Sequence, residues 1–329
     1  MNNRGLYKPV LLICVFAMML SCKQERVLHP VVFDSSCFLF FLIVSCSKIA
    51  EQIVETPNWG EFIDYREGNI PLMIISVHGG NLEPEWIESR TCDGATVVRD
   101  SYTRDVAIEI ESQIKTNGYS PYVVLNNLHR KKLDLNRSLN NSNCGDQTTQ
   151  PYWDLFHKQI DNFRTQIQNQ FGSGLVIDIH GQSHEEQRIE LGYLLYSSEL
   201  RMDTTTINSV DFKNRSSVKN LLNNHPDNLK LTDLLSGKSS MGNLLTQKGY
   251  ASVPSKDDVA PKEGELYFSG GYNTVTYGSR DIRTVDAIQI ELNMLGVRDT
   301  NENRTLFSKE FAEVLITYLR TYYKSDLLN

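Results

Sequence analysis

The sequence predicts an α/β domain built on a mostly parallel mixed sheet with helices on both faces. Short, continuous apolar runs of the kind that form strands buried on both sides alternate with amphipathic stretches of helical period. This alternation is typical of strands paired through helical crossovers. With 40% hydrophobic and 22% charged residues the chain is globular in composition. Its 329 residues would allow two domains, but the single alternating pattern without internal repeats favours one.

The first strand is predicted at residues 72–77, an apolar run closed by Gly79-Gly80. A helix is expected over 100–117, because apolar residues recur there every four positions between a cap at Asp100 or Ser101 and a stop at Gly118. The next elements are a strand at 121–128 and an amphipathic helix at 151–171 that ends at Gly172.

The second half of the chain continues the same alternation. A buried strand is predicted at 174–179, a further one at 191–196 and another at 287–292, followed by a last helix at 305–323. The polar, Asn-rich stretch 202–235 is interpreted as an elaboration on the sheet and not as a separate domain.

The N-terminal 46 residues are predicted to be an export segment. Basic residues precede two apolar runs, which end at Ser21-Cys22 and Ser45-Cys46 and resemble bacterial lipoprotein signals. The second matches better, because Ile43 and Val44 precede its serine, so either Cys22 or, preferably, Cys46 is the lipidated mature N-terminus. Neither run reaches the roughly 20 residues of a membrane-spanning helix. The alternative is a pair of short uncleaved anchors; otherwise we expect an envelope lipoprotein, in the periplasm or at the outer membrane, that touches the membrane only through its lipid.

The resulting organisation is an export segment at 1–46, a linker at 47–70 and a catalytic domain at 71–329. Four of the six cysteines belong to the first segment, which leaves Cys92 and Cys144 in the domain. An exported chain with two such cysteines permits one disulfide, and their spacing does not suggest a zinc–thiolate site.

The net charge of −7 argues against a nucleic-acid partner, since phosphate neutralisation needs a basic face.

Chemistry is predicted at the carboxyl ends of the strands, where open α/β sheets bind ligands. His78 and His180 each follow an apolar strand and precede glycine, and Glu83 lies five residues beyond His78. Two histidines and a glutamate form the ligand set of many hydrolytic zinc sites, whose fourth position stays open for water. His184, four residues after His180, is a competing ligand.

Other residues suit an acidic substrate. Asn136 and Arg137 place an amide beside a guanidinium, a pair well shaped to hold a carboxylate, unless Arg137 instead braces its loop through Asp134. Glu291 lies within an apolar strand, where burial raises a carboxyl pKa as a general base requires; the alternative is a salt bridge to a neighbouring strand. Arg130 is the nearby cation expected to stabilise an oxyanion.

An ordered set of motifs resembles the N-formylglutamate amidohydrolase family over roughly residues 71–322. The motifs are His78-Gly-Gly, Arg99-Asp-Ser-Tyr before a helix, Leu133-Asp-Leu-Asn-Arg137, Asp178-Ile-His-Gly181, and Gly270-Gly-Tyr-Asn-Thr-Val-Thr-Tyr-Gly278 leading to Gln289-Ile-Glu-Leu292. The HGGNLE stretch is also similar to the metal motif of phage-type poly-γ-glutamate hydrolases. The resemblance implies a zinc carboxypeptidase-like, phosphorylase/hydrolase-like fold and a Zn²⁺-dependent hydrolase.

Residue roles follow from the resemblance. It implies His78, Glu83 and His180 as metal ligands, with Asp105 as the substitute for Glu83. It also implies that Glu291 is the catalytic carboxylate, that Asn136 and Arg137 bind the substrate carboxylate, and that Gly271 and Tyr272, with Tyr277, line the pocket. The chain departs from the family at His180-Gly181, where deformylases usually carry His-Ser.

The predicted activity is hydrolysis of an N-acyl, γ-glutamyl or peptide amide beside a glutamate-like carboxylate, by metal-activated water with Glu291 as base. Because formylglutamate arises in the cytoplasm, an envelope enzyme is expected to act on other glutamyl amides or peptides. The alternative function is an envelope substrate-binding lipoprotein that keeps the fold without catalysis.

Overall fold

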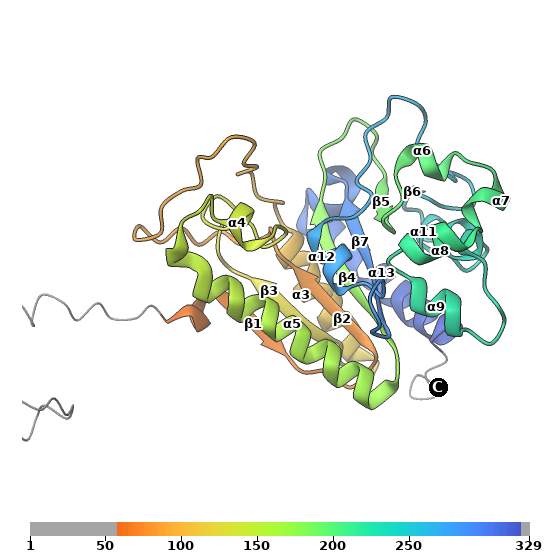
Figure 1. Cartoon of the computed structure of the whole chain (residues 1–329), viewed down its shortest axis with the longest axis horizontal. Coiled ribbons are helices and arrows are strands. Elements are labelled where there is room, and N and C mark those ends of the chain that lie inside the picture. The colour runs from red at the N-terminus through yellow and green to blue at the C-terminus, as the bar shows by residue number, and fades with distance from the viewer. Residues whose placement is uncertain (1–57, 324–329) are drawn as a thin grey trace, which may run out of the picture. The chain divides into compact units, whose positions relative to one another are not determined.

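One seven-stranded mixed sheet organises the chain. The computed structural model describes residues 58–323, in which the strands run in the order β1-β3-β2-β4-β7-β5-β6 (Figure 1). The predicted α/β class, with a mostly parallel mixed sheet, is confirmed. The strand bounds are Ile63–Arg66 (β1), Leu72–Ser76 (β2), Tyr122–Asn126 (β3), Gly174–Gly181 (β4), Ile189–Gly192 (β5), Ser252–Val253 (β6) and Val285–Leu292 (β7).

The centre of the sheet is parallel and its flanks are partly antiparallel. Strands β3, β2, β4 and β7 pair in parallel, so their carboxyl ends meet at one edge. The edge strand β1 pairs antiparallel with β3, and β5 pairs antiparallel with β7. A short helical turn, η1 (Trp59–Phe62), and β1 both lie in the segment expected to be a linker. The folded unit therefore begins before residue 71.

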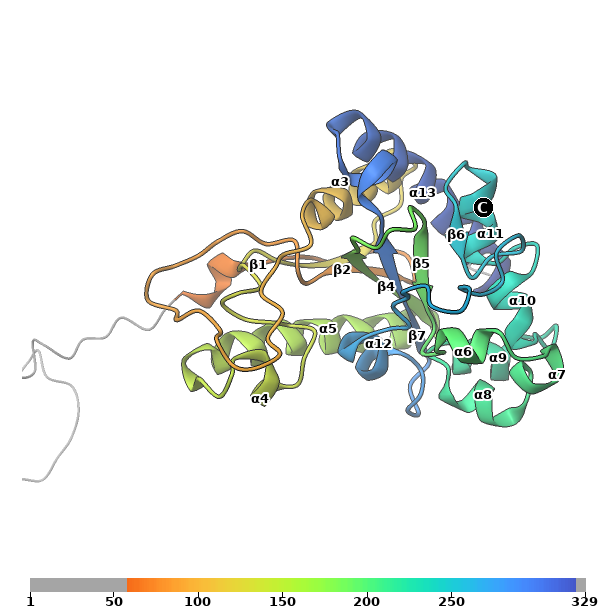
Figure 2. The ribbon, with the colours of Figure 1, turned by 90° about the horizontal axis from the view of Figure 1, so that it is seen from above.

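Helices cover both faces of the sheet, as Figure 2 shows from above. On one face lie α3 (Thr103–Thr116) and α13 (Asn301–Tyr322), which pack against each other. On the other lie α5 (Gln150–Phe171), which ends at Gly172 as predicted, and α12 (Tyr272–Tyr277). Two apolar layers fill the space, one including Ile110, Ile177 and Phe311, the other Phe156, Val176 and Ala287.

The polar stretch after β5 folds into a group of short helices beside the sheet. Its buried leucines and Phe212 join the core on the α13 side. This agrees with an elaboration on the sheet. The helices are α6 (Ser197–Leu200), α7 (Thr204–Ile207), α8 (Val210–Arg215), α9 (Lys219–Asn224), α10 (Leu231–Ser236) and α11 (Met241–Gln247).

The start of α3 differs from the expectation. Its N-cap is Tyr102, in the left-handed region at φ 68°, and not Asp100 or Ser101. Asp100 still supports the first turn, because its carbonyl accepts from the Thr103 backbone N–H at 3.2 Å. The side chain of Asp100 is left free of capping and is available to the site described below.

The two remaining cysteines form a disulfide. Cys92, in the long loop between β2 and α3, is bonded to Cys144, which follows α4 (Leu139–Ser142). Between Cys144 and α5 lies η2 (Gln147–Thr149), and the last turn, η3 (Met294–Arg298), follows β7. The disulfide that the sequence permitted is thus present, and it joins two loops at the carboxyl edge of the sheet.

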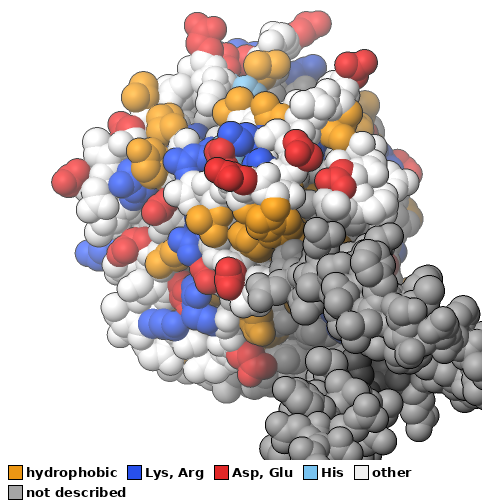
Figure 3. Space-filling view, turned by 90° about the vertical axis from the view of Figure 1, so that its left-hand side faces the viewer, with side chains coloured by type: hydrophobic (Ala, Val, Ile, Leu, Met, Phe, Trp, Pro, Cys, Tyr) orange, Lys and Arg blue, Asp and Glu red, His pale blue; other side chains and the backbone are white. Residues whose placement is uncertain are grey.

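The predictions for the export segment, including Cys22 and Cys46, fall outside the described residues. Across residues 58–323, no helix has the length and apolar character needed to cross a membrane. On the face drawn in Figure 3, basic side chains stand next to acidic ones and apolar side chains lie between them.

Candidate metal centre and active site

Three side chains from separate segments converge at the carboxyl edge of the sheet. His78 follows β2, His180 lies near the end of β4, and Asp100 ends the long loop before α3. His78 Nδ1 lies 3.2 Å from His180 Nδ1, and Asp100 Oδ2 lies 3.2 Å from His180 Nδ1 and 3.4 Å from His78 Nδ1. These residues form a group that could hold a metal ion.

The spacing of the three ligand atoms fits a tetrahedral cation. Bonds of the length that zinc makes to nitrogen and oxygen place tetrahedral ligand atoms about 3.3 Å apart. The three separations in this cluster, 3.2, 3.2 and 3.4 Å, match that spacing. Two imidazoles and a carboxylate are also a donor set typical of catalytic zinc sites. The residues therefore fit the predicted metal.

A further carboxylate lies next to the Nε2 atom of each histidine, on the ring edge that faces away from the cluster. His78 Nε2 shares a 2.7 Å hydrogen bond with Asp134 Oδ1, and His180 Nε2 lies 3.0 Å from Asp178 Oδ2. Both carboxylates are buried. The hydrogen bond to Asp134 fixes the ring orientation of His78 and leaves its other nitrogen free for a metal, whereas Asp178 contacts His180 as a charged neighbour without a hydrogen bond. Asp178 precedes His180 by two residues on β4, so strand alternation places both side chains on one face.

Electrostatics favour charged groups in the cluster. Burial raises the pKa of Asp100, but the imidazoles of His78 and His180 outweigh it and hold that pKa well below its usual range. Burial lowers the pKa of His180, but Asp178 and Asp100 outweigh it and raise that pKa well above the usual value. The acidic groups around the imidazoles thus attract positive charge, which a metal ion would supply.

The cluster opens into a cavity of about 210 Å³. Most predicted site residues line it, although they are distant in the sequence. The lining includes the two histidines and Asp100, with Glu291, Arg130, Asn136, Arg137 and Gly271 among the rest.

Glu291 lies beside the cluster on β7. It is the register partner of His180 across the parallel pair β4 and β7, and its Oε1 accepts a 2.9 Å hydrogen bond from Gln289 Nε2. Burial raises the pKa of Glu291 to about 8, against the lowering effect of His180. Among the described residues Glu291 has no ion pair with an arginine, so the salt-bridge alternative is not found. A carboxylate with a raised pKa is a stronger proton acceptor.

Two arginines also line the cavity. Arg130 lies 3.1 Å from Asp134 Oδ2 and 3.5 Å from Asp100 Oδ1, so it bridges a candidate ligand and a supporting carboxylate. Arg137 is exposed and donates to the Asn136 carbonyl at 3.1 Å. Within residues 58–323 its guanidinium has no carboxylate partner; Asp134, the alternative partner, is held by His78 and Arg130.

Gly271 and Asn136 are packed together at the start of α12. A Cβ at Gly271 would lie 2.3 Å from Asn136 Nδ2, so only glycine leaves room for this amide. Asn136 Oδ1 accepts from the Asn273 backbone N–H at 2.9 Å. Tyr272, predicted to line the pocket, is not among the lining residues; its ring packs near Trp153.

The structure does not bring the predicted third ligand, Glu83, to the cluster. Glu83 is paired with Lys131 and lies 3.6 Å from His129 Nε2, away from the cluster. The substitute Asp105 is exposed on α3 and is not part of the cluster either. Asp100 occupies the position instead, because the chain between β2 and α3 returns to the sheet edge there. His184 is also excluded, since its Nδ1 lies 2.8 Å from Glu190 Oε1.

Arg298 is a positioning residue that the sequence did not reveal. Its buried guanidinium donates to the backbone carbonyls of Ser101, Gln182 and Leu292, at 2.6 to 3.1 Å. A Cβ at Gly181 would lie 2.5 Å from Arg298 Cζ. The glycine after the second histidine therefore makes room for a side chain that joins the Asp100 loop to the ends of β4 and β7.

Three of the solved structures that match this chain do so at 10% to 15% identity and with TM-scores below 0.5. N-formylglutamate amidohydrolase from Ralstonia eutropha JMP134 shares 12% identity and a TM-score of 0.49, covering 80% of this chain and 98% of its own. A gene product from Agrobacterium tumefaciens shares 10% sequence identity with this chain, with a TM-score of 0.48. The match covers 80% of this chain and 95% of that protein. The zinc-free structure of YNDL shares 15% sequence identity with this chain, with a TM-score of 0.35. The match covers 82% of this chain and 95% of that protein.

No protein-family model matches the chain, and no curated protein matches it either. One of the matched structures bears the name of the family that the motifs resemble. These likenesses are distant, so the function proposed for this chain rests on the residues of its site.

Proposed function

We propose that this protein is a metal-dependent hydrolase, with Zn²⁺ as the metal, that cleaves an amide bond next to a carboxylate-bearing, glutamate-like group. The observation that carries the proposal is the convergence of two Nδ1 atoms and one carboxylate oxygen at 3.2 to 3.4 Å, with a second carboxylate behind each imidazole. Bound there, the ion would polarise the amide carbonyl and acidify a water molecule.

Glu291 is the general base in this proposal. It lines the same cavity as the cluster and is the register partner of His180, which places a carboxylate where it would take a proton from water and later give it to the leaving amine. Gln289, which donates to Glu291 Oε1, holds the carboxyl group in place.

Arg130 and Arg137 have different roles. Arg130, held by Asp100 and Asp134, is a fixed cation beside the metal ligands and would stabilise negative charge on the carbonyl oxygen. Arg137 has no carboxylate partner among the described residues and lines the cavity beside Asn136. It would bind the substrate carboxylate through a charge-assisted pair.

Two measurements test this function. Protein purified without chelator is expected to hold one zinc ion per chain by elemental analysis, and His180→Ala is expected to lose it. The zinc form is then screened against N-acyl-glutamates, γ-glutamyl peptides and cell-wall peptides. Protein that binds no metal would overturn the proposal, whereas bound substrate without turnover would favour the substrate-binding alternative. Export and lipid attachment at Cys46 remain predictions.

A further inference from the structure

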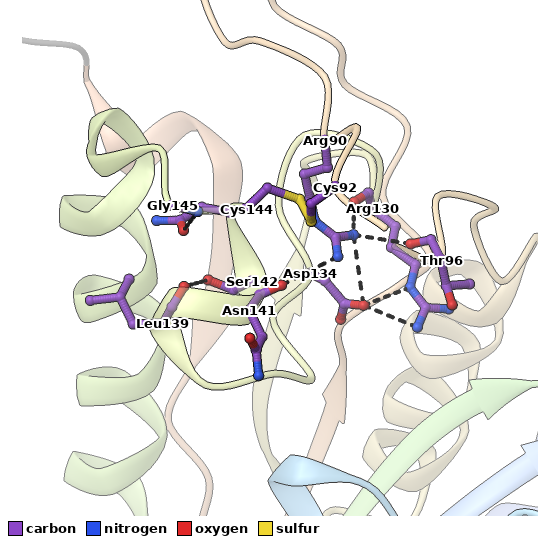
Figure 4. Close-up of a disulfide and its surroundings, with 11 residues drawn as sticks. Arg90, Cys92, Thr96, Arg130, Asp134, Leu139, Asn141, Ser142, Cys144 and Gly145 are labelled. Atoms are coloured by element: carbon purple, nitrogen blue, oxygen red, sulfur yellow. Dashed lines mark hydrogen bonds and ion pairs between the residues drawn. A yellow bond between two sulfur atoms is a disulfide. The ribbon is translucent and has the colours of Figure 1, made fainter. Parts of the chain in front are cut away.

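A second cavity, of about 490 Å³, lies beside the first. Its walls are the loop 90–95 and the segment 137–145, which the Cys92–Cys144 disulfide joins (Figure 4). Arg137 lines both cavities. A ligand held at Arg137 in the first cavity therefore has the second cavity within reach.

The same loop also separates the two spaces. Gly94 and Ala95 line the second cavity, whereas the next residue, Thr96, lines the first. Arg90 Nη1 donates to the Thr96 carbonyl at 3.0 Å, and Arg90 Nη2 donates to the Asn141 carbonyl at 3.4 Å. Figure 4 shows these bonds beside the disulfide. The Arg90 side chain and the Cys92–Cys144 disulfide thus hold the two loops together.

The second cavity offers donors that the protein leaves unused. The Arg90 side chain is 3% exposed and lines this cavity, yet its Nε–H has no hydrogen-bond partner. Arg137, exposed and without a carboxylate partner in the described chain, stands at the boundary. Asn140, Asn141 and one acidic residue, Asp93, also line the space. Arg90 is paired with Asp134 at 3.8 Å, so it offers this cavity a buried Nε–H, while Arg137 offers a guanidinium without a carboxylate partner among the described residues. These donors suit a ligand that carries carbonyl and carboxylate oxygens.

We propose that the second cavity is a substrate subsite for a carboxylate-bearing peptide extension. This inference rests on the proposed function and deepens it. The substrate is then a peptide in which the glutamate-like residue at Arg137 continues by one or two residues, whose backbone and carboxylate lie between the disulfide-joined loops. A single acyl-amino acid would fill the first cavity alone.

The test compares substrates of two lengths on the zinc-loaded protein. N-acetyl-glutamate is measured against N-acetyl-glutamate extended by one or two residues through its α- or γ-carboxyl group, each with a free or an amidated end. The extended substrate with a free carboxylate is expected to show a kcat/KM at least about tenfold higher than both the short substrate and the amidated one. Equal values for all three would overturn the subsite.

Asn140→Trp is the variant that separates the two cavities. Asn140 is exposed on α4 and lines only the second space, so an indole there should obstruct the extension without touching the metal cluster. The expected result is loss of the length preference, with unchanged kcat/KM for the short substrate. Asn223→Trp, at an exposed asparagine of the short helix α9, is the matched control and should change neither value.

The outcomes distinguish this inference from the proposed function. Absence of bound metal and of all hydrolysis contradicts the hydrolase itself. Hydrolysis of the short substrate without a length preference contradicts the subsite alone. If metal binds but nothing is hydrolysed, calorimetry with the same peptides decides, since the subsite still requires tighter binding of the extended carboxylate and its loss in Asn140→Trp.

Discussion

His180 and Glu291 are register partners on the adjacent parallel strands β4 and β7. Neighbouring strands lie about 4.8 Å apart, so this register brings the backbone of a candidate metal ligand next to that of the candidate base. Eight consecutive residue pairs, from Gly174 with Val285 to Gly181 with Leu292, maintain it. The candidate ligand and the candidate base therefore stand on two interior strands of the sheet.

Replacing Glu291 separates catalysis from metal binding. Glu291→Gln keeps the side-chain volume but removes the proton acceptor. We expect kcat to fall by about 10²- to 10⁴-fold while the bound zinc per chain stays unchanged. Steady-state kinetics and elemental analysis of the same preparation check this. Full activity in Glu291→Gln would remove this residue from the mechanism.

A pair of acidic variants identifies the third ligand. Asp100→Asn should lose the metal or bind it far more weakly, because its Oδ2 is one of the three converging atoms. Glu83→Gln should retain it, because Glu83 is paired with Lys131 away from the cluster. Metal affinity measured by competition with a chelator distinguishes them, and the reverse result would restore the ligand expected from the sequence.

Asp134 is expected to tune metal affinity without touching the ion. Asp134→Asn replaces the carboxylate that holds His78 Nε2, and loss of such a partner typically weakens metal binding by about 10- to 100-fold. The control is Asp211→Asn, at an exposed carboxylate paired with Arg215. The same dissociation constant for both variants would mean that Asp134 does not orient the ligand.

Gly181→Ser tests the space that Arg298 occupies. The added Cβ would meet the guanidinium at 2.5 Å, so Arg298 must move and the Asp100 loop should lose its support. We expect weaker metal binding and a lower melting temperature. Gly60→Ser, whose Cβ would approach only Asn58 Oδ1 at 3.2 Å, serves as the control. Unchanged metal binding in Gly181→Ser would show that Arg298 does not position the Asp100 loop.

The stability of the sheet should depend on pH through Asp286. Burial raises the pKa of this carboxyl to about 6, although Ser279 and Tyr323 donate to it. Between the unfolded pKa of about 3.9 and about 6 the folded chain binds more protons than the unfolded chain, so this group lowers the free energy of unfolding as pH rises.

The variant Asp286→Asn cannot ionise at this position. Its free energy of unfolding, relative to the wild type, should therefore increase by up to about 3 kcal/mol between about pH 4 and about pH 7. Denaturant titrations at several pH values measure the difference. A difference that stays constant with pH would show that Asp286 titrates normally.

The strands and the residues at their ends could be predicted from the sequence. Apolar runs ending in His-Gly placed His78 and His180 at one sheet edge, because the carboxyl ends of parallel strands meet there. Glu291 could be predicted as a functional residue because a charged side chain within a buried apolar strand is costly without a role. Local periodicity was sufficient in these cases, since each residue belongs to a regular element or directly follows one.

Residues carried by loops could not be placed in this way. Asp100 reaches the cluster at the end of the long segment after β2, whose path depends on the disulfide, Arg90 and Arg298 and not on any period. Sequence proximity instead favoured Glu83, which a lysine from another loop removes from the site. The antiparallel pairing of β1 and β5 was equally inaccessible, because strand direction depends on the connections and not on composition.

The Cys92–Cys144 bond has a practical consequence for anyone who produces this protein. The bond joins the two loops that wall the second cavity and hold Arg90 near Asp134. A reducing cytosol would keep both thiols apart. Recombinant material should therefore be made by secretion or in an oxidising host, and its thiol content counted before any kinetic constant is compared between preparations.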